Sequence, residues 1–407
     1  MADVEPLHAL HYDLSRVGGL QPVAAPPYDV IDAAQRAELV SRSPYNVVEV
    51  DLPVNSGGDI YEHAAEVLKR WHGEGILTRD QKPALWALAQ EYTGPDGETR
   101  TRHGVFARVR VEDYGPGRIR PHERTHPGPK EDRLRLTRAT RANLSPIFSL
   151  FDDPSNAAWR ALEPHLNTAP WGEVTDEDGT VHRLWRVHDP QAIAAYQDVL
   201  RGTELLIADG HHRYETARVY HQEHPGADHV LMCLVALQDP GLTVFPTHRL
   251  AVNASQGALN ALQEELERDW TEDHRDTISI GVYRGGGKRT LYLKDLAIAD
   301  AAMAGKPEPY RRLDTAVLEA LILTGPLGLT EDDISHLHGL DYARTEEEAI
   351  AKVDAGDADV AFLMAATPVE RVRDVAAAGE NMPPKSTYFY PKVLTGLVFN
   401  PLEDQWP

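Results

Sequence analysis

The sequence is poor in cysteine, in basic residues and in long hydrophobic runs. Its single cysteine, Cys233, excludes an internal disulfide and a cysteine-rich metal site. The chain has 41 Lys and Arg against 63 Asp and Glu, a formal net charge of −22, so we expect it to bind neither nucleic acid nor an anionic membrane. No stretch approaches the roughly 20 apolar residues of a membrane span, and the first residues lack a signal-peptide pattern. We therefore expect a cytoplasmic protein.

The length of 407 residues predicts two or three domains. Strand and helix patterns alternate over the first 250 residues, and amphipathic helices dominate from about 253, which predicts a mixed α/β (α+β) fold with a more helical C-terminal part. We place the regions at 1–252, 253–380 and 381–407, and expect the last to pack back on the core. The oligomeric state stays open.

Local patterns predict several individual elements. We expect a strand over Val47–Val50 and a loop over 118–130, which is rich in Pro, His and Gly, followed by a helix over 131–142. A single helix is expected over Leu313–Leu323. A short buried strand, Glu204–Ala208, leads into a helix that ends near His224, because Pro225 and Gly226 follow.

The turn between that strand and that helix has the clearest chemical signature in the chain. Asp209 and Gly210 are followed by His211, His212 and Arg213. Glycine permits a tight turn, the free N–H groups of a helix start attract anions, and Arg can grip a phosphate with two hydrogen bonds. Asp209 could hold Mg²⁺ or accept a proton. The alternative is that Asp209 only caps the helix. Two adjacent His residues without a His-Glu-x-x-His pattern do not indicate zinc here.

A second stretch, 118–141, holds eight Lys or Arg against three acids within this acidic chain. Functional groups are common on loops, so the candidate ligands within it are His122, Arg124, Thr125 and Lys130. Glu123, surrounded by cations, should stay ionised and could act as a base or a metal ligand. The alternative for the arginines at 135 and 138 is a solvated helix face.

Three weaker segments add candidates for substrate binding. They are Thr247, His248 and Arg249; Lys385 and Ser386; and Tyr28 and Asp29. For each of these, a structural role is an open alternative. Gly285–Lys288 lacks the G-x-x-x-x-G-K-[ST] spacing of a phosphate-binding loop and is expected to be a hairpin turn.

Several of these segments, taken together and in order, resemble the domain-of-unknown-function family 1015. The resemblance is carried by Ala25-Pro-Pro-Tyr-Asp-Val30, His122-Glu-x-Thr125, Asp132-Arg-Leu134, Ala139-Thr-x-Ala-Asn143, Ser145-Pro-Ile-Phe148, the run Ala208–Ala217, Pro246-Thr-His-Arg249 and Met382-Pro-x-Lys-Ser-Thr-Tyr-Phe389. It spans nearly the whole chain.

The turn at 209–213 also resembles that of the ParB/sulfiredoxin superfamily, and within it the free-serine kinases. The resemblance implies a ParB-like core with a mixed sheet. It also implies phosphoryl transfer to a small hydroxyl acceptor such as L-serine, giving O-phosphoserine, with ATP, ADP or pyrophosphate as donor and Mg²⁺ as cofactor. Asp209, His211 and Glu123 are then the candidate catalytic residues, with Glu49 and Asp29 as other possible bases. Two alternatives stay open: a ParB-like nucleotide-binding regulatory module, and a phosphohydrolase that uses the same site.

Overall fold

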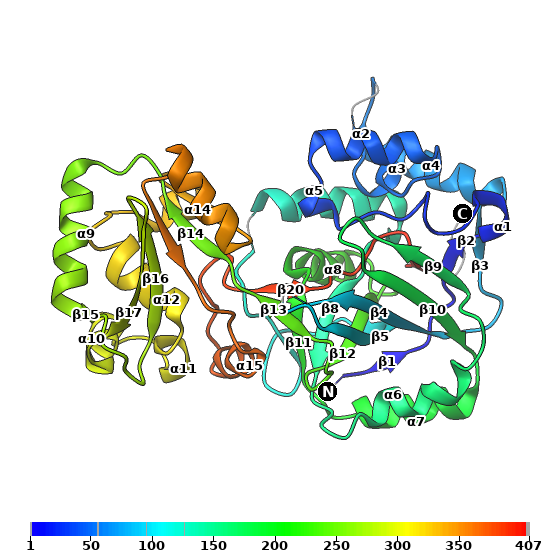
Figure 1. Ribbon diagram of the computed structural model, residues 1–407. Coiled ribbons are helices and arrows are strands. Elements are labelled where there is room, and N and C mark those ends of the chain that lie inside the picture. The colour runs from blue at the N-terminus through cyan, green and yellow to red at the C-terminus, as the bar shows by residue number, and fades with distance from the viewer. Residues whose placement is uncertain (1, 55–56, 95, 126, 404–407) are drawn as a thin grey trace. The chain divides into compact units, whose positions relative to one another are not determined.

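The computed structural model describes residues 2–54, 57–94, 96–125 and 127–403. They form two compact units. Unit 1 comprises Met1–Pro121, Thr125–Thr243 and Pro391–Pro407, and unit 2 comprises His122–Arg124 and Val244–Tyr390. The predicted mixed α/β class is confirmed, because both units combine helices with sheets (Figure 1). The boundaries at 252 and 380 stay a prediction.

The elements of unit 1, in chain order, are β1 (Val4–Glu5), β2 (Leu10–Tyr12), α1 (Leu14–Val17), η1 (Tyr28–Val30), α2 (Ala33–Arg42), α3 (Val48–Asp51), α4 (Ile60–Gly73), β3 (Leu77–Arg79), β4 (Leu85–Thr93), β5 (Thr99–Arg110), β6 (Ile119–Arg120), α5 (Pro127–Thr140), β7 (Ala142–Asn143), β8 (Ile147–Phe151), α6 (Ala157–Leu162), η2 (Glu163–His165), β9 (Gly172–Thr175), β10 (Val181–Val187), α7 (Pro190–Leu200), β11 (Leu205–Asp209), α8 (His211–Glu223), β12 (His229–Ala236) and β21 (Asn400–Pro401).

Unit 1 is built on a sheet whose strands, within the described residues, follow the order β6-β11-β8-β12-β5-β4-β10-β9, with β1 also paired to β5. Strand β12 pairs parallel to β8 and antiparallel to β5, and all eight of its residues are buried, as expected for a central strand. Helices α6 and α7 pack together below this sheet in the view of Figure 1, and α5 packs against α8 above it.

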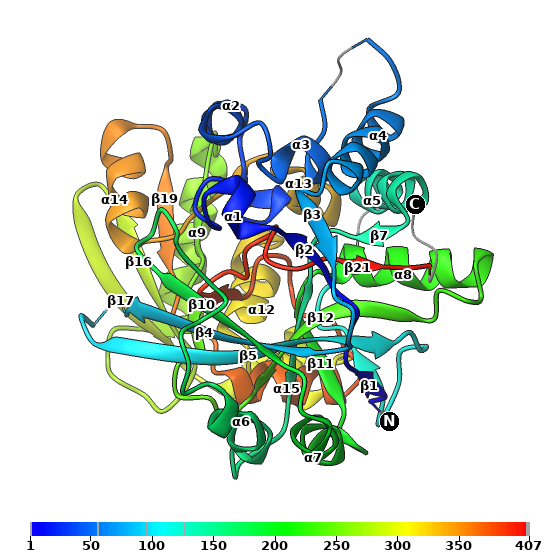
Figure 2. The ribbon, with the colours of Figure 1, turned by 90° about the vertical axis from the view of Figure 1, so that its right-hand side faces the viewer.

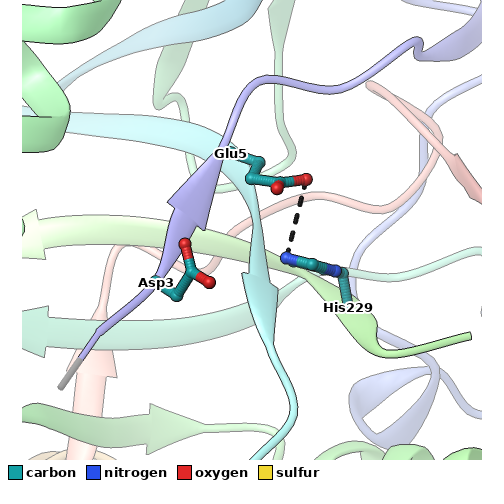
Figure 3. Close-up of side chains that lie close together, drawn as sticks. All are labelled: Asp3, Glu5 and His229. Carbon is teal, nitrogen blue, oxygen red and sulfur yellow. Dashed lines mark ion pairs between the residues drawn. The ribbon is translucent and has the colours of Figure 1, made fainter.

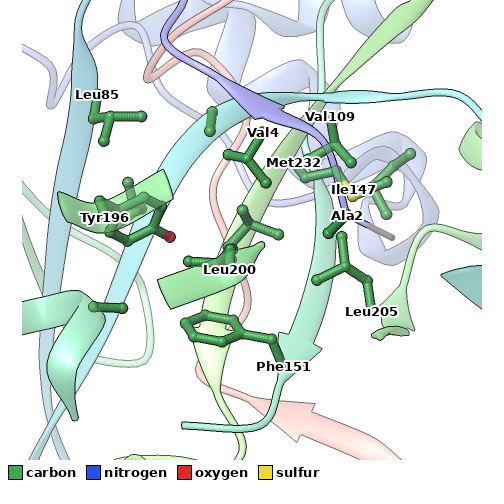
Figure 4. Packing of buried hydrophobic residues seen from close by; sticks show 14 of the residues in the cluster. Ala2, Val4, Leu85, Val109, Ile147, Phe151, Tyr196, Leu200, Leu205 and Met232 are labelled. Carbon is green, nitrogen blue, oxygen red and sulfur yellow. The ribbon is translucent and has the colours of Figure 1, made fainter. Parts of the chain in front are cut away.

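The hydrophobic core of unit 1 joins strands that are far apart in the sequence. Figure 4 shows Val4 and Leu85 beside Tyr196 and Leu200 of α7, and Val109, Ile147 and Met232 in the same cluster. Burial of this many aliphatic side chains, each contributing about 1.5–3 kcal/mol, stabilises the sheet that carries the turn at 209–213.

The elements of unit 2 are β13 (Thr243–Phe245, whose first residue closes a segment of unit 1), β14 (His248–Ala251), α9 (Gln256–Asp269), β15 (Trp270–Thr271), β16 (Ser279–Arg284), β17 (Gly287–Leu293), α10 (Leu296–Ala302), α11 (Glu308–Arg311), α12 (Asp314–Leu318), the π-helix η3 (Glu319–Leu323), α13 (Glu331–His336), β18 (Leu340–Ala343), α14 (Glu346–Ala355), β19 (Val360–Leu363), α15 (Val369–Ala377) and β20 (Tyr388–Tyr390).

Unit 2 has its own sheet, of strand order β15-β17-β16-β19-β14-β18, with a small core around Leu250, Ala361 and Leu363. The predicted hairpin is confirmed as β16 and β17, which pair antiparallel around the glycine turn. Figure 2 shows these strands with α14 nearby in the same unit.

Two expectations on local structure are wrong, and a third needs a refinement. Val47–Val50 does not form a strand, because α3 begins at Val48, whose N–H donates to Oδ1 of Asn46 at 3.2 Å and so turns the chain just before the helix. Helix α5 begins at Pro127, so Lys130 lies on a helix rather than in a loop. Proline does not break a helix in its first turn, because the N–H groups there have no partner within the helix. The helix can therefore begin at this residue.

The refinement concerns Leu313–Leu323. The predicted helix is confirmed, because helical structure runs without a break from Asp314 to Leu323; only its second half, η3, is π-helical rather than α-helical. The predicted strand and helix around the 209–213 turn are confirmed as β11 and α8. No helix among the described residues is long and apolar enough to cross a membrane.

Candidate functional site

The turn between β11 and α8 combines a strand irregularity with a glycine in a left-handed conformation. The pairing of β11 with β8 shifts register between Ile207 and Asp209, and such bulges re-aim the side chains that follow them. Gly210 has φ +97° and occupies the N-cap position of α8. The alternative in which Asp209 occupies that position is therefore wrong.

Glycine is required at position 210 for a second reason. A Cβ atom there would lie 3.0 Å from Nε of Arg213 and 3.1 Å from its Cζ, so the guanidinium covers the backbone of the turn. The close approach and the positive φ together explain why the chain has no side chain at this place.

Asp209 is surrounded by positive charge. Its Oδ2 lies 3.4 Å from Nη2 of Arg213 and 3.8 Å from Nζ of Lys392. Burial raises the pKa of the Asp209 carboxyl, but the charges of Lys392, Arg213 and His211 outweigh this effect and bring that pKa to about 2. The carboxylate therefore stays ionised at neutral pH, and it is better suited to hold a cation than to accept a proton.

Arg213 connects the turn to a small cavity. Its Nη1 donates to the carbonyl oxygen of Pro146, and its side chain is 11% exposed. The cavity has a volume of about 40 Å³, and Asp51, Arg133 and Ser145 also line it. This volume is large enough for a few water molecules. The cavity could therefore take one small group of a ligand but not a whole nucleotide.

Asp51 and Arg133 form the buried floor of this cavity. Nη1 of Arg133 lies 3.4 Å from Oδ1 of Asp51 and donates to its backbone oxygen at 2.7 Å, and the Ser145 hydroxyl donates to Oδ2 at 2.8 Å. Burial raises the pKa of the Asp51 carboxyl, although Arg133 and the Ser145 hydrogen bond oppose the rise. The Arg133 guanidinium also stacks 4.1 Å from the ring centre of Tyr28.

A second buried arginine, Arg102, is close enough to Asp209 for their charges to interact. Among the described residues it forms no ion pair with a carboxylate. Arg102 is fully buried, and its Nε donates to Oε1 of Gln90 at 3.0 Å. The Gln90 amide in turn donates to the backbone oxygen of Lys392 at 2.9 Å. Burial lowers the pKa of the Arg102 guanidinium to about 10, which leaves it charged at neutral pH. Through Gln90, Arg102 thus helps to place the segment that carries Lys392.

The structure assigns the predicted site residues to two groups. Unit 1 contains Tyr28, Asp29, Thr125, Lys130, Asp209, Gly210, His211, His212 and Arg213, and unit 2 contains His122, Glu123, Arg124, Thr247, His248, Arg249, Lys385 and Ser386. Within unit 1, the charges of both Arg213 and Asp29 act on Tyr28, whose pKa burial raises to about 12. The Thr216 hydroxyl of α8 lies 3.3 Å from the backbone oxygen of Lys130.

Within unit 2, the predicted residues are held mainly by backbone contacts. Arg249 is 2% exposed and donates to the carbonyl oxygens of Thr247 at 2.6 Å, Pro384 at 3.2 Å and Lys385 at 3.3 Å. Nδ1 of His248 accepts from the Met364 amide at 3.0 Å.

The remaining predicted residues of unit 2 also have defined partners. Ser386 donates to the carbonyl oxygen of Pro383 at 2.7 Å, and Nε2 of His122 lies 3.1 Å from the Thr387 hydroxyl. Burial raises the pKa of the Glu319 carboxyl, which the charges of Arg249 and Arg124 partly offset.

Four residues around Asp209 and the cavity beside Arg213 were not among the predicted site residues: Asp51, Arg102, Arg133 and Lys392. Two signals were present in the sequence. Arg133 belongs to the motif Asp132-Arg-Leu134, and Lys392 closes the aromatic segment that begins at Met382. Of the other predicted bases, Glu49 is paired with Arg36 at 3.2 Å.

The fold and the turn define a mixed α/β protein with a strand–glycine–helix turn rich in cationic side chains. The chain belongs to the family described as protein of unknown function DUF1015, which matches residues 4–316. The resemblance to that family is thereby confirmed, and the relation to the ParB/sulfiredoxin superfamily stays a prediction. No curated protein matches the sequence significantly.

Three solved structures are similar at low levels. A conserved hypothetical protein from Pyrococcus furiosus is 17% identical, with 74% of this chain and 96% of that chain covered and a TM-score of 0.38. A free serine kinase in complex with AMP is 16% identical, with 70% and 86% covered and a TM-score of 0.38. SbnI from Staphylococcus aureus, with a C-terminal truncation, is 15% identical, with 74% and 90% covered and a TM-score of 0.39. At such scores, nothing about the activity of this chain follows from them.

Proposed function

We propose that this chain is a small-molecule phosphotransferase whose turn from Asp209 to Arg213 binds the phosphates of the donor. The observation that carries the proposal is the grouping of Arg213, Lys392 and the start of α8 around one glycine turn within unit 1. Helix N–H groups and cations together are what a phosphate needs, and the net charge of −22 makes such a local positive group unusual in this chain.

Asp209 is proposed to serve the same donor. One ionised carboxylate beside phosphate oxygens is a donor set that suits Mg²⁺, which binds proteins through one or two carboxylates and completes its shell with water and phosphate. When bound, Mg²⁺ would neutralise charge on the phosphates. Lys392 and Arg213 would hold the remaining phosphate oxygens.

The acceptor in this proposal is a small hydroxyl compound, and L-serine is the first to test because of the family resemblance. The hydroxyl oxygen forms a bond to the transferred phosphorus, the bond from that phosphorus to the donor's bridging oxygen breaks, and a carboxylate takes the hydroxyl proton. Asp209 is too acidic to be a good acceptor of that proton. We keep Glu123 as the proposed base.

The proposal is tested by incubating the full chain with Mg²⁺, L-serine and, separately, ATP, ADP and pyrophosphate, and following products by ³¹P NMR. We expect phosphoserine with one of these donors. Release of inorganic phosphate without phosphoserine would instead identify a hydrolase. Donor binding without any turnover would favour the nucleotide-binding module. No binding and no product would refute a phosphate site.

The base is tested with Glu123→Gln against Glu131→Gln, which alters an exposed carboxylate on α5. We expect Glu123→Gln to lower kcat by about 100- to 10,000-fold while donor binding survives, and the Glu131 variant to behave like the wild type. If kcat is unchanged in Glu123→Gln, another carboxylate is the base, and Asp51, whose pKa is raised by burial, is the next to change.

A further inference from the structure

Three potential metal ligands converge on one face of the unit 1 sheet, near the start of the chain. A ligand atom from each of Asp3, Glu5 and His229 lies within 4.8 Å of the others. Figure 3 shows Asp3 and Glu5 beside β1 and His229 on β12, with the imidazole directed at the Glu5 carboxylate. None of these residues belongs to the phosphate turn.

The sheet register explains why these side chains meet. Both β1 and β12 pair with β5. Glu5 is opposite Arg108, and His229 is opposite Arg110, whose N–H donates to the backbone oxygen of Asp3. Asp3 and His229 therefore flank Arg110 at one level of the sheet. Glu5 is two residues from Asp3, so it faces the same side.

The imidazole of His229 points its Nε2 toward the Glu5 carboxylate. Its side chain is 6% exposed, and Nδ1 lies 2.7 Å from Oδ1 of Asp228. Nε2 is buried and makes no hydrogen bond to any residue that the structure describes. With the proton on Nδ1 shared with Asp228, Nε2 directs a lone pair toward Glu5, and a carboxylate behind a histidine is the usual support of a metal-binding imidazole.

The separation of His229 and Glu5 fits two ligands of a tetrahedral ion, and the Asp3 ligand atom lies within 4.8 Å of both. Nε2 of His229 and Oε2 of Glu5 are 3.6 Å apart, which is too long for a hydrogen bond. Two ligand atoms bound at the usual zinc distances are separated by about 3.4 Å in a tetrahedron, so the observed gap is close to that of two zinc ligands. Histidine nitrogen and carboxylate oxygen are both zinc donors, and three protein ligands leave a fourth position for water.

The neighbouring charges allow a cation. Arg108 donates to Oε2 of Glu5 through Nη2 at 2.5 Å and Nε at 3.1 Å. Arg110 donates to Oδ2 of Asp3 at 2.8 Å and to Oδ2 of Asp228 at 2.7 Å. Three carboxylates against two guanidinium groups leave one net negative charge. Hydrogen bonds to the carboxylates also orient them, as second-layer contacts do in metal sites.

We propose that Asp3, Glu5 and His229 bind one Zn²⁺, which ties β1 to β12 across β5. The site is separate from the phosphotransferase proposal and does not depend on it. Since β1 is only two residues long, an ion that joins it to a central strand would fix the first strand of the chain more firmly than its backbone pairing alone.

The test uses the full chain, freed of metal with a chelator, and titrated with Zn²⁺ by calorimetry. We expect one tight site per chain, a melting temperature raised by a few degrees, and no displacement by excess Mg²⁺, which prefers oxygen ligands. Co²⁺ in the same site should give the strong visible absorption of tetrahedral coordination.

Glu5→Gln and His229→Gln should each abolish tight Zn²⁺ binding, because each removes a direct ligand, and His224→Gln, on a histidine outside the cluster, should not. Glu5 is partly exposed, so its variant is expected to fold even if the buried His229 variant does not. Unchanged Zn²⁺ stoichiometry and affinity in Glu5→Gln, with a normal circular dichroism spectrum, would overturn the proposal. So would the absence of a tight site in the wild type.

Discussion

Two arginines that follow a histidine in the sequence both donate to backbone carbonyl oxygens, but their other neighbours differ between the two units. Arg213 in unit 1 is 11% exposed, lies beside the ionised Asp209 and lines a cavity. Arg249 in unit 2 is 2% exposed, and its hydrogen bonds to described residues go to backbone carbonyl oxygens. In the proposed function the first meets the phosphate donor, whereas the second holds the path of residues 384 and 385 through its hydrogen bonds. The same His-Arg pair would then provide a ligand contact in one unit and a structural brace in the other.

The largest expected effect is a loss of stability when the structural arginine, Arg249, is replaced. We expect Arg249→Leu to destabilise the protein by about 3–5 kcal/mol, because it removes a buried charge that faces the buried carboxyls of Asp314 and Glu319 and leaves three carbonyl oxygens unsatisfied. Urea unfolding and the melting temperature measure this. If Arg249→Leu keeps normal stability but loses substrate binding, Arg249 is a ligand contact after all.

The second effect concerns activity rather than stability. Arg213→Ala should lower phosphoryl transfer by about 100- to 1,000-fold, because it removes a donor aimed at developing phosphate charge. Arg138→Ala is the matched control, since Arg138 pairs with Glu223 on the exposed side of α5, and such pairs contribute about 0–1 kcal/mol. An Arg213 variant with wild-type turnover would make both arginines structural.

The smallest expected effect is on the turn at 209–213, where a side chain at position 210 should lower both stability and donor binding. Gly210→Ala should cost about 1–2 kcal/mol of stability from the left-handed backbone, and should also weaken donor binding by displacing the Arg213 guanidinium. Gly226→Ala is the control, because a Cβ there meets nothing within 4 Å and its φ is ordinary. Equal stability and donor binding in the two variants would show that the 209–213 turn tolerates a side chain.

The sequence predicted the turn well because its signals are local. An apolar run, Asp-Gly and a polar helical stretch are consecutive, so β11 and α8 could be placed without knowing the rest of the fold. The prediction of a strand at Val47–Val50 was wrong because β-branched residues indicate burial as much as they indicate a β-strand. Here the burial is achieved by the short helix α3.

The other residues around the turn could not be predicted from local patterns, because their contacts join positions far apart in the sequence. Lys392 is 183 residues from Asp209 in the sequence, and Asp51 is 82 residues from Arg133. Neither pair forms a local pattern. Burial is equally hidden, since nothing in Thr247-His-Arg249 shows that carbonyl oxygens from 384 and 385 surround the guanidinium.

The placement of Lys392 also bears on the synthesis of the protein. A ribosome must translate all of Val244–Tyr390 before it reaches the segment that contributes Lys392 to Asp209 and Thr395 to Ser145. Until then, a nascent chain carries the phosphate turn with one of its cations missing. The site is therefore completed only after Val244–Tyr390 has been made, and until then a nascent chain has Asp209 without the lysine that helps to keep it ionised.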